Sequence, residues 1–433
     1  MANGMVAQRT MRQLAAGLLC GLAFAASAQE SSLGPFWDAR EAEATGDPAS
    51  PVRIGIWDSG VDLALFPAQV ARDPEGRPLV RGYDAFKQRQ DTPLAVLPDA
   101  VLARQDELNG ILRALDDRDG GIESPAAREI SARMKAQTPA EADAFDDVTG
   151  RWSGYVHGTA IADIALRGLP DARIVVARQQ WWHGRPPVPC WTRELADREA
   201  ASIGDLLQFL VANGARVVNM SWGRAERAYL GNLKACAPQM PEAERTELAR
   251  YTVERIRAVL QDGMRNAPQV LFVGAAGNAG ASLQDENPAT RFSLPNFVMV
   301  GAVDRKGEAT DWTNTGAEIG LFASGDRVPA RLPGGGVSYP SGTSMAAPLV
   351  ANAAVKMLVA APDLSGARLR ELLERTATPN ATGQRLLHPR AAVEAARAEG
   401  VAGRPPAAMP AGADSPPMPG PPVPGKTRTQ GRP

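Results

Sequence analysis

Histidine and cysteine are scarce in this 433-residue chain, which holds three of each. Lys and Arg number 47 against 48 Asp and Glu, so the formal net charge is only -1. That balance gives no electrostatic reason to expect a nucleic-acid partner. The length suits one large domain or two average ones, and hydrophobic residues, at 44% of the chain, are enough to form a buried core. Beyond the N-terminal region we expect no segment that spans a membrane.

Residues 1–28 have the organisation of a signal peptide. Two arginines precede an apolar run over 14–26 that is too short to cross a bilayer. Residues 26–28, Ala-Ser-Ala, form a small-residue cleavage site that places the mature N-terminus near Gln29. The alternative is a short membrane anchor. We expect an exported monomer, periplasmic or extracellular, with no stable membrane insertion after cleavage.

Two cysteines, Cys190 and Cys236, remain after removal of Cys20 with the signal peptide. An even pair in an oxidising compartment is typical of a disulfide. We therefore expect these two to be bridged, although the sequence does not place them close in space.

Residues 51–396 have the pattern of an α/β domain. A poorly ordered lead-in over 29–50 is expected before it, and a disordered Pro-, Gly- and Ala-rich tail over 397–433 after it. Strands that alternate with helices predict a doubly wound, mostly parallel sheet with helices on both faces. The predicted strands are 52–57, 172–177, 216–220, 270–275 and 297–303, and the predicted helices are 202–213, 242–264 and 345–359.

An insertion over about 87–150 departs from this pattern, because it is charged, helix-prone and broken by Gly120, Gly121 and prolines. Its length exceeds that of an ordinary connection, which favours a lid or a binding element. A surface insertion without a role is the alternative.

Ser344 lies where a Gly-rich segment enters an apolar helix. A helix N-terminus stabilises developing negative charge, which suits a nucleophilic serine, although an ordinary N-cap serine would lie there too. Such a serine needs a base. His157 opens a similar Gly turn into a helix, whereas His183 lies in a Trp- and Pro-rich loop and His388 precedes a proline. His157 is therefore the candidate base.

A carboxylate is needed to hold the tautomer of that base. Asp58, at the end of the first predicted strand, is the candidate, with Asp62 as its local competitor. Asn278, in a Gly-flanked loop, offers an amide suited to an oxyanion, although it could equally be a turn asparagine.

The ordered set of segments resembles the subtilisin family of serine peptidases. Residues 54–61, 157–159, 276–278 and 342–348 carry the resemblance. It implies a subtilisin-like fold and a serine endopeptidase that cleaves proteins or peptides through an acyl-enzyme. It also implies an Asp58, His157, Ser344 triad with Asn278 in the oxyanion hole, substrate pairing by Ser221, Trp222 and Gly223, and a pocket wall of Ala275, Ala276 and Gly277.

Four positions depart from the family pattern without removing a catalytic atom. Ala160 and Asp163 follow His157 where the family commonly has histidine and glycine, Leu349 replaces a usual histidine, and Trp222 replaces a smaller residue. Trp222 is expected to crowd neighbouring subsites. The uncharged wall predicts apolar residues before the scissile bond.

No cofactor is predicted from the residues. The family resemblance adds calcium as a candidate ion, but no acidic cluster can be assigned to it. A catalytically silent peptide-binding relative, a serine-carboxyl peptidase and a non-enzymatic adaptor are the alternative functions. Residues 29–50 are too few for a folded pro-segment, so we expect none to be self-cleaved.

Overall fold

The computed structural model describes residues 32–46, 48, 50–180, 190–285, 291 and 293–402. The predicted signal peptide, His183 and the tail beyond residue 402 lie outside the described residues.

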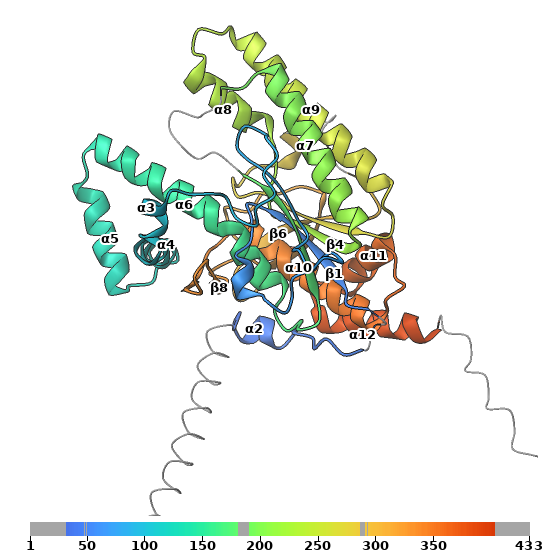
Figure 1. The fold of residues 1–433 in the computed structure, drawn as a ribbon. Helices are drawn as coiled ribbons and strands as arrows, with labels where there is room; N and C mark the ends of the chain where they lie inside the picture. The colour runs from blue at the N-terminus through green and yellow to red at the C-terminus, as the bar shows by residue number, and fades with distance from the viewer. Residues whose placement is uncertain are drawn as a thin grey trace, which may run out of the picture.

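A central sheet organises the described part of the chain (Figure 1). It has nine strands, in the order β10-β11-β7-β6-β5-β4-β1-β3-β2. All neighbouring strands run parallel except β10 and β11, so the predicted mostly parallel sheet is confirmed. The strands are β1 Arg53–Asp58, β2 Val80–Tyr83, β3 Arg173–Gln179, β4 Ala215–Met220, β5 Leu271–Ala275, β6 Phe297–Val303, β7 Ile319–Ser324, β10 Thr378–Pro379 and β11 Arg385–Leu386.

Helices cover both faces of this sheet, as predicted. Side chains alternate along each strand, so Ile54 and Ile56 join one core while Trp57 joins the other. The helices that pack in the first core are α2 Pro35–Asp38, α6 Pro139–Ala165, α10 Thr343–Ala360, α11 Gly366–Thr376 and α12 Pro389–Ala402. The helices that pack in the second core are α7 Arg193–Ala212, α8 Glu226–Cys236 and α9 Glu242–Arg265.

Helix α10 is long and apolar enough to cross a membrane, which the sequence analysis did not expect of any later segment. In the fold it is the central helix of the first core, and 83% of it is buried inside the molecule. Its apolar composition therefore reflects burial on all sides.

Both ends of the predicted domain differ from expectation. The predicted poorly ordered lead-in includes α2, whose Trp37 is 4% exposed and donates its indole N–H to Asp304 O at 3.1 Å. At the other end α12 continues to Ala402, beyond the predicted boundary at 396. The structure joins Cys190 to Cys236 in the expected disulfide.

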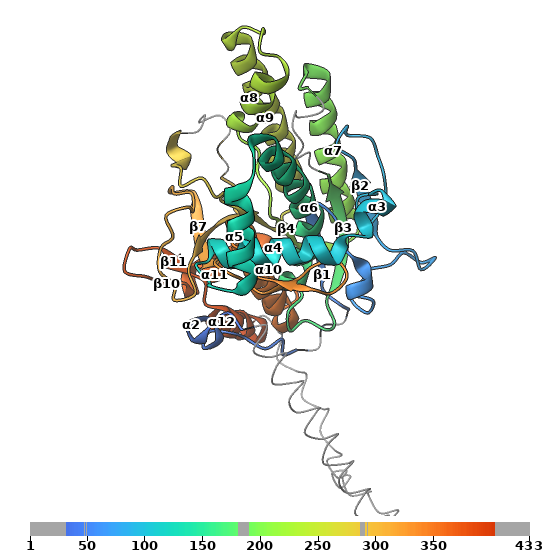
Figure 2. The same cartoon turned by 90° about the vertical axis from the view of Figure 1, so that its left-hand side faces the viewer.

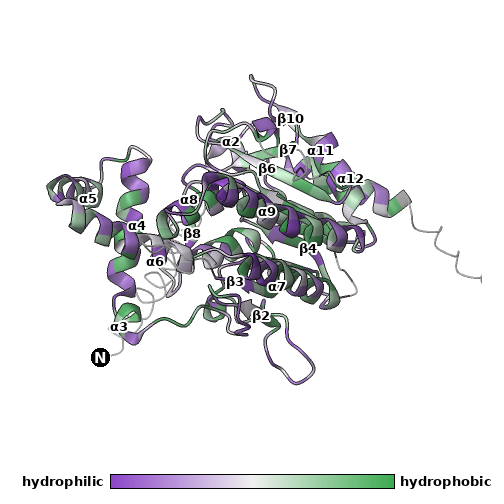
Figure 3. Cartoon of the chain, turned by 90° about the horizontal axis from the view of Figure 1, so that it is seen from above, coloured by the Kyte–Doolittle hydropathy of each residue, from purple (hydrophilic) through white to green (hydrophobic). Residues whose placement is uncertain are grey.

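The insertion forms a small helical unit that projects from the sheet (Figures 1 and 2). It comprises α3 Asp99–Leu102, α4 Gln105–Asp119, α5 Pro125–Ala136 and the first half of α6. Ala114, Ile130 and Phe145 form its own minor core, and hydrophilic residues alternate with hydrophobic ones along α4 (Figure 3). Because α6 is unbroken, the unit is continuous with the helix that carries His157. The expectation that His157 opens a Gly turn into a helix is therefore wrong, since the helix begins well before it, at Pro139.

Candidate active site

Asp58 and His157 form a direct hydrogen-bonded pair. Asp58 ends β1 and is fully buried, and its Oδ1 lies 2.7 Å from His157 Nδ1 and accepts the Ser59 N–H at 2.7 Å. Burial alone would lower the pKa of His157, but the charge and hydrogen bond of Asp58 raise it above its ordinary value. The pair therefore has the arrangement of a base oriented by a carboxylate.

Glycine at position 158 allows α6 to approach the end of β1. A Cβ there would lie 2.3 Å from Gly60 O and 3.1 Å from Asp58 Cβ. The Gly158 N–H instead donates to Ser59 Oγ at 3.0 Å. Asp62, the competing carboxylate, accepts backbone N–H groups from Ala64 and Gly334. The structure thus pairs His157 with Asp58.

Ser344 occupies the second residue of α10, whose N-cap is Gly342. The ordinary N-cap role is therefore not the one that Ser344 has. Its Oγ donates to Ser221 O at 3.2 Å, and its own carbonyl accepts from Ser221 Oγ at 2.8 Å. Strand β1 pairs with β4 in parallel, with Ile56 opposite Asn219, so Asp58 and Ser221 lie at the same edge of the sheet. The Asp58–His157 pair and the Ser221 that contacts Ser344 therefore lie at the same, carboxyl end of these parallel strands.

Asn278 is held by the nucleophile segment through its side-chain oxygen. Oδ1 accepts hydrogen bonds from Thr343 N and Thr343 Oγ1, both at 2.8 Å. A Cβ on Gly342 would lie 3.1 Å from Asn278 Nδ2, so the missing side chain leaves space beside the amide. With Oδ1 bonded to Thr343, Nδ2 is the donor of this side chain, and an amide N–H is a group suited to an oxyanion.

The role of a turn asparagine belongs to Asn314, which the sequence analysis missed. Its Oδ1 accepts the N–H groups of Ala279 and Ala281, and its Nδ2 donates to Ala276 O at 2.8 Å. Asn314 thereby shapes the loop that carries Asn278.

One cavity of about 290 Å³ contains every predicted substrate-binding residue. Ser344 and Asn278 also line it, as do three arginines that the sequence analysis did not predict. The predicted lining residues are Ser221, Trp222, Gly223, Ala275, Ala276 and Gly277, and the added arginines are Arg224, Arg227 and Arg257.

Trp222 does not have the exposed position expected of a residue that crowds subsites. Its side chain is 8% exposed and meets the Trp57 ring edge-on at 5.0 Å. The Arg224 guanidinium lies 5.3 Å from the Trp222 ring. Trp222 therefore packs mainly into the second core.

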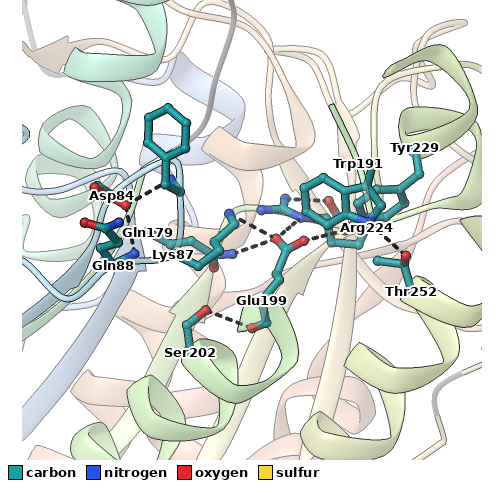
Figure 4. Close-up of polar contacts among 12 residues, drawn as sticks. Asp84, Lys87, Gln88, Gln179, Trp191, Glu199, Ser202, Arg224, Tyr229 and Thr252 are labelled. Atoms are coloured by element: carbon teal, nitrogen blue, oxygen red, sulfur yellow. Dashed lines mark hydrogen bonds and ion pairs between the residues drawn. The ribbon is translucent and has the colours of Figure 1, made fainter. Parts of the chain in front are cut away.

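A buried carboxylate, Glu199, supports this wall of the cavity (Figure 4). It is 1% exposed, and Arg224 Nε, Tyr229 OH and Lys87 Nζ lie 3.0, 3.0 and 3.4 Å from its oxygens. Burial would raise the pKa of Glu199, but the charges of Lys87 and Arg224 lower it to about 2. The ionised carboxylate holds Arg224 directly after the predicted substrate-pairing segment.

His388 lies apart from this arrangement and has a local contact. Its Nδ1 accepts the Ala391 N–H at 3.3 Å at the start of α12. Burial lowers the pKa of His388. Among the residues that the structure describes, no three His, Cys, Asp or Glu side chains converge as metal ligands.

Comparison with known proteins gives a family match over most of the chain. The family model described as the subtilase family matches residues 51–390. Subtilisin E of Bacillus subtilis is 35% identical over 109 residues, covering 25% of this chain and 29% of the relative. The Penicillium rubens protease Pen ch 13 is 35% identical over 119 residues, covering 26% and 29%. These matches therefore span less than a third of each relative's length.

Solved structures of similar fold have lower sequence identity. A cold-adapted subtilisin-like serine proteinase is 19% identical, with a TM-score of 0.47 over 78% of this chain and 89% of that one. The subtilase cytotoxin SubAB is 16% identical, with a TM-score of 0.49 over 86% and 96%.

Proposed function

Since this chain belongs to the subtilase family, we propose that it is an exported serine endopeptidase that uses Asp58, His157 and Ser344. The observation that carries the proposal is the arrangement at the sheet edge. There the Asp58–His157 pair, 2.7 Å between Oδ1 and Nδ1, accompanies a serine at the start of α10. The proposed substrates are proteins or peptides, and the proposed active form is a monomer.

The reaction follows from the positions of these groups. The Ser344 hydroxyl turns from Ser221 O towards the base, loses its proton to His157 and attacks the peptide carbonyl carbon. Asn278 Nδ2 and the Ser344 N–H donate to the oxyanion. His157 then protonates the leaving amine, and a water molecule that it activates hydrolyses the acyl-enzyme. Asp58 stabilises the imidazolium in both halves of the reaction.

Export is proposed from the N-terminal sequence. The basic region, the apolar run over 14–26 and the cleavage site after Ala28 support it. The disulfide between Cys190 and Cys236 suits an oxidising compartment. The proposed organisation is a signal peptide, a lead-in, the peptidase domain with its insertion, and a C-terminal tail.

A fluorophosphonate probe that labels nucleophilic serines tests the function directly. We expect the purified wild type to be labelled and to cleave a denatured protein substrate, and Ser344→Ala to do neither. Ser131→Ala, a matched change on α5 in the insertion, should behave as wild type. An unlabelled wild type would favour a catalytically silent relative, and activity confined to acidic pH would favour a serine-carboxyl peptidase.

A further inference from the structure

Helix α4 of the insertion holds the segment that leads into Ser344. Asp116 Oδ2 accepts the Ser338 hydroxyl at 2.5 Å and the Tyr339 N–H at 3.1 Å. Ser338 ends β9 Val337–Ser338, which pairs with β8 Ala330–Arg331 in a small hairpin. The chain passes from this hairpin directly to the start of α10.

Arg327 gives α4 a second route to the same segment. Its Nη1 donates to Asp116 O at 2.6 Å, and its Nη2 lies 2.8 Å from Asp117 Oδ1. The backbone N–H of Arg327 donates to Ser341 Oγ at 2.9 Å. Both guanidinium and carboxylate are largely buried, so water screens the Arg327–Asp117 ion pair less than it would on the surface.

The same helix is also attached to α6. Trp152 Nε1 donates to Asn109 Oδ1 at 2.9 Å, and Asn109 Nδ2 donates to Pro333 O at 3.1 Å. Trp152 belongs to α6, which continues without a break to His157. A single amide on α4 therefore joins the His157 helix to the loop of the hairpin that precedes Ser344.

We propose that the insertion is a built-in support for catalysis, in which Asp116 is a positioning residue that fixes the 338–344 segment relative to α6. This inference rests on the proposed function, because it assigns Asp116 a role in aligning Ser344 with His157. Asp116 acts through Ser338 and Tyr339, and it touches neither Ser344 nor the cavity that the substrate would occupy. These contacts favour support over surface decoration.

Asp116→Ala in the full-length protein tests the role. The change removes both acceptor contacts and leaves the Tyr339 N–H without this partner. A displacement of about 1 Å at a reacting centre costs about 100-fold in rate, so we expect kcat to fall by roughly ten- to 100-fold. KM should change little, because Asp116 is not among the residues that line the cavity.

A conservative variant and a matched control sharpen the test. Asp116→Asn should restore most of kcat, since one amide oxygen can accept both hydrogen bonds. Asp106→Asn, the same change at an exposed position of α4, should equal wild type. All rates are expressed per active site titrated with the fluorophosphonate probe.

The proposal is overturned if Asp116→Ala lowers only the melting temperature while kcat per labelled site stays at the wild-type value. Should that variant fail to fold, Ser338→Ala removes one of the two contacts and decides in the same way through kcat. A wild type that the probe does not label would instead overturn the proposed function, and the positioning role with it.

Discussion

Replacement of Asn278 by Ala is expected to lower kcat by roughly 10²–10³, about 2.7–4 kcal/mol of transition-state stabilisation. The side chain has two separable parts in this structure. Its Oδ1 accepts from Thr343 N and Oγ1, and its Nδ2 is the donor that we propose for the oxyanion. Because that donor strengthens its contact only as charge develops on the oxygen, KM should change much less than kcat.

Thr343→Val separates these two parts. It removes the hydroxyl that donates to Asn278 Oδ1 and accepts the Gly277 N–H, but it keeps the backbone N–H bond to Asn278 and the whole amide. If the lost donor dominates, Thr343→Val should cost far less than Asn278→Ala in steady-state kinetics on a peptide substrate with titrated sites. An Asn278→Ala enzyme with unchanged kcat and a raised KM would refute the oxyanion role.

Further outcomes follow from the same geometry. His157 must be neutral to act as a base, and its pKa is raised above the ordinary histidine value of about 6.5. We therefore expect kcat/KM to fall as the pH is lowered through that raised pKa. A pH-rate profile in which kcat/KM does not fall on the acidic side would contradict the assignment. The Cys190–Cys236 disulfide closes a loop with a sequence separation of 46, so breaking it should lower the free energy of unfolding by about 4 kcal/mol. An unchanged midpoint of denaturant unfolding would argue against a structural role for the disulfide. The three arginines that line the cavity should disfavour Lys and Arg before the scissile bond, so a library profile dominated by basic residues there would overturn this view of the pocket. Because the lead-in packs on the core, we expect no self-cleavage within it. N-terminal sequencing should therefore find that wild type and Ser344→Ala both begin near Gln29. A shortened N-terminus in wild type alone would reveal self-processing.

Most of the central strands could be predicted because they are buried on both faces, although β7, which is buried along its whole length, was missed. β1, β3, β4, β5 and β6 are short, nearly continuous apolar runs, which is the pattern of strands in a covered parallel sheet. The edge strand β2 is half-exposed and β8 has only two residues, so neither has such a pattern. Helix α11 was missed although Leu369, Leu372 and Leu373 have helical spacing and are buried.

The members of the candidate triad could be picked out for a different reason, because each lies in a recognisable local motif. Asp58 ends β1 and Ser344 lies at the start of α10, whereas His157 was picked out by the Gly158 that follows it, inside α6. Glu199 has no such motif. It lies on an amphipathic helix where a carboxylate would ordinarily face solvent, and its partners Lys87 and Arg224 come from distant segments. The three arginines that line the cavity have no local sequence motif either. Only the packing of α8 and α9 over the sheet brings them beside Ala275 and Ala276.

The insertion shows why composition alone leaves function undecided. Its charged sequence, interrupted by glycines and prolines, is equally compatible with a surface insertion that has no role and with one that takes part in function. Two features of the tertiary structure favour an insertion that has a role. Helix α6 crosses the expected boundary at residue 150 and carries His157, and Asp116 accepts hydrogen bonds from the segment before Ser344. We therefore expect a residue in the insertion to affect catalysis without lying in the cavity.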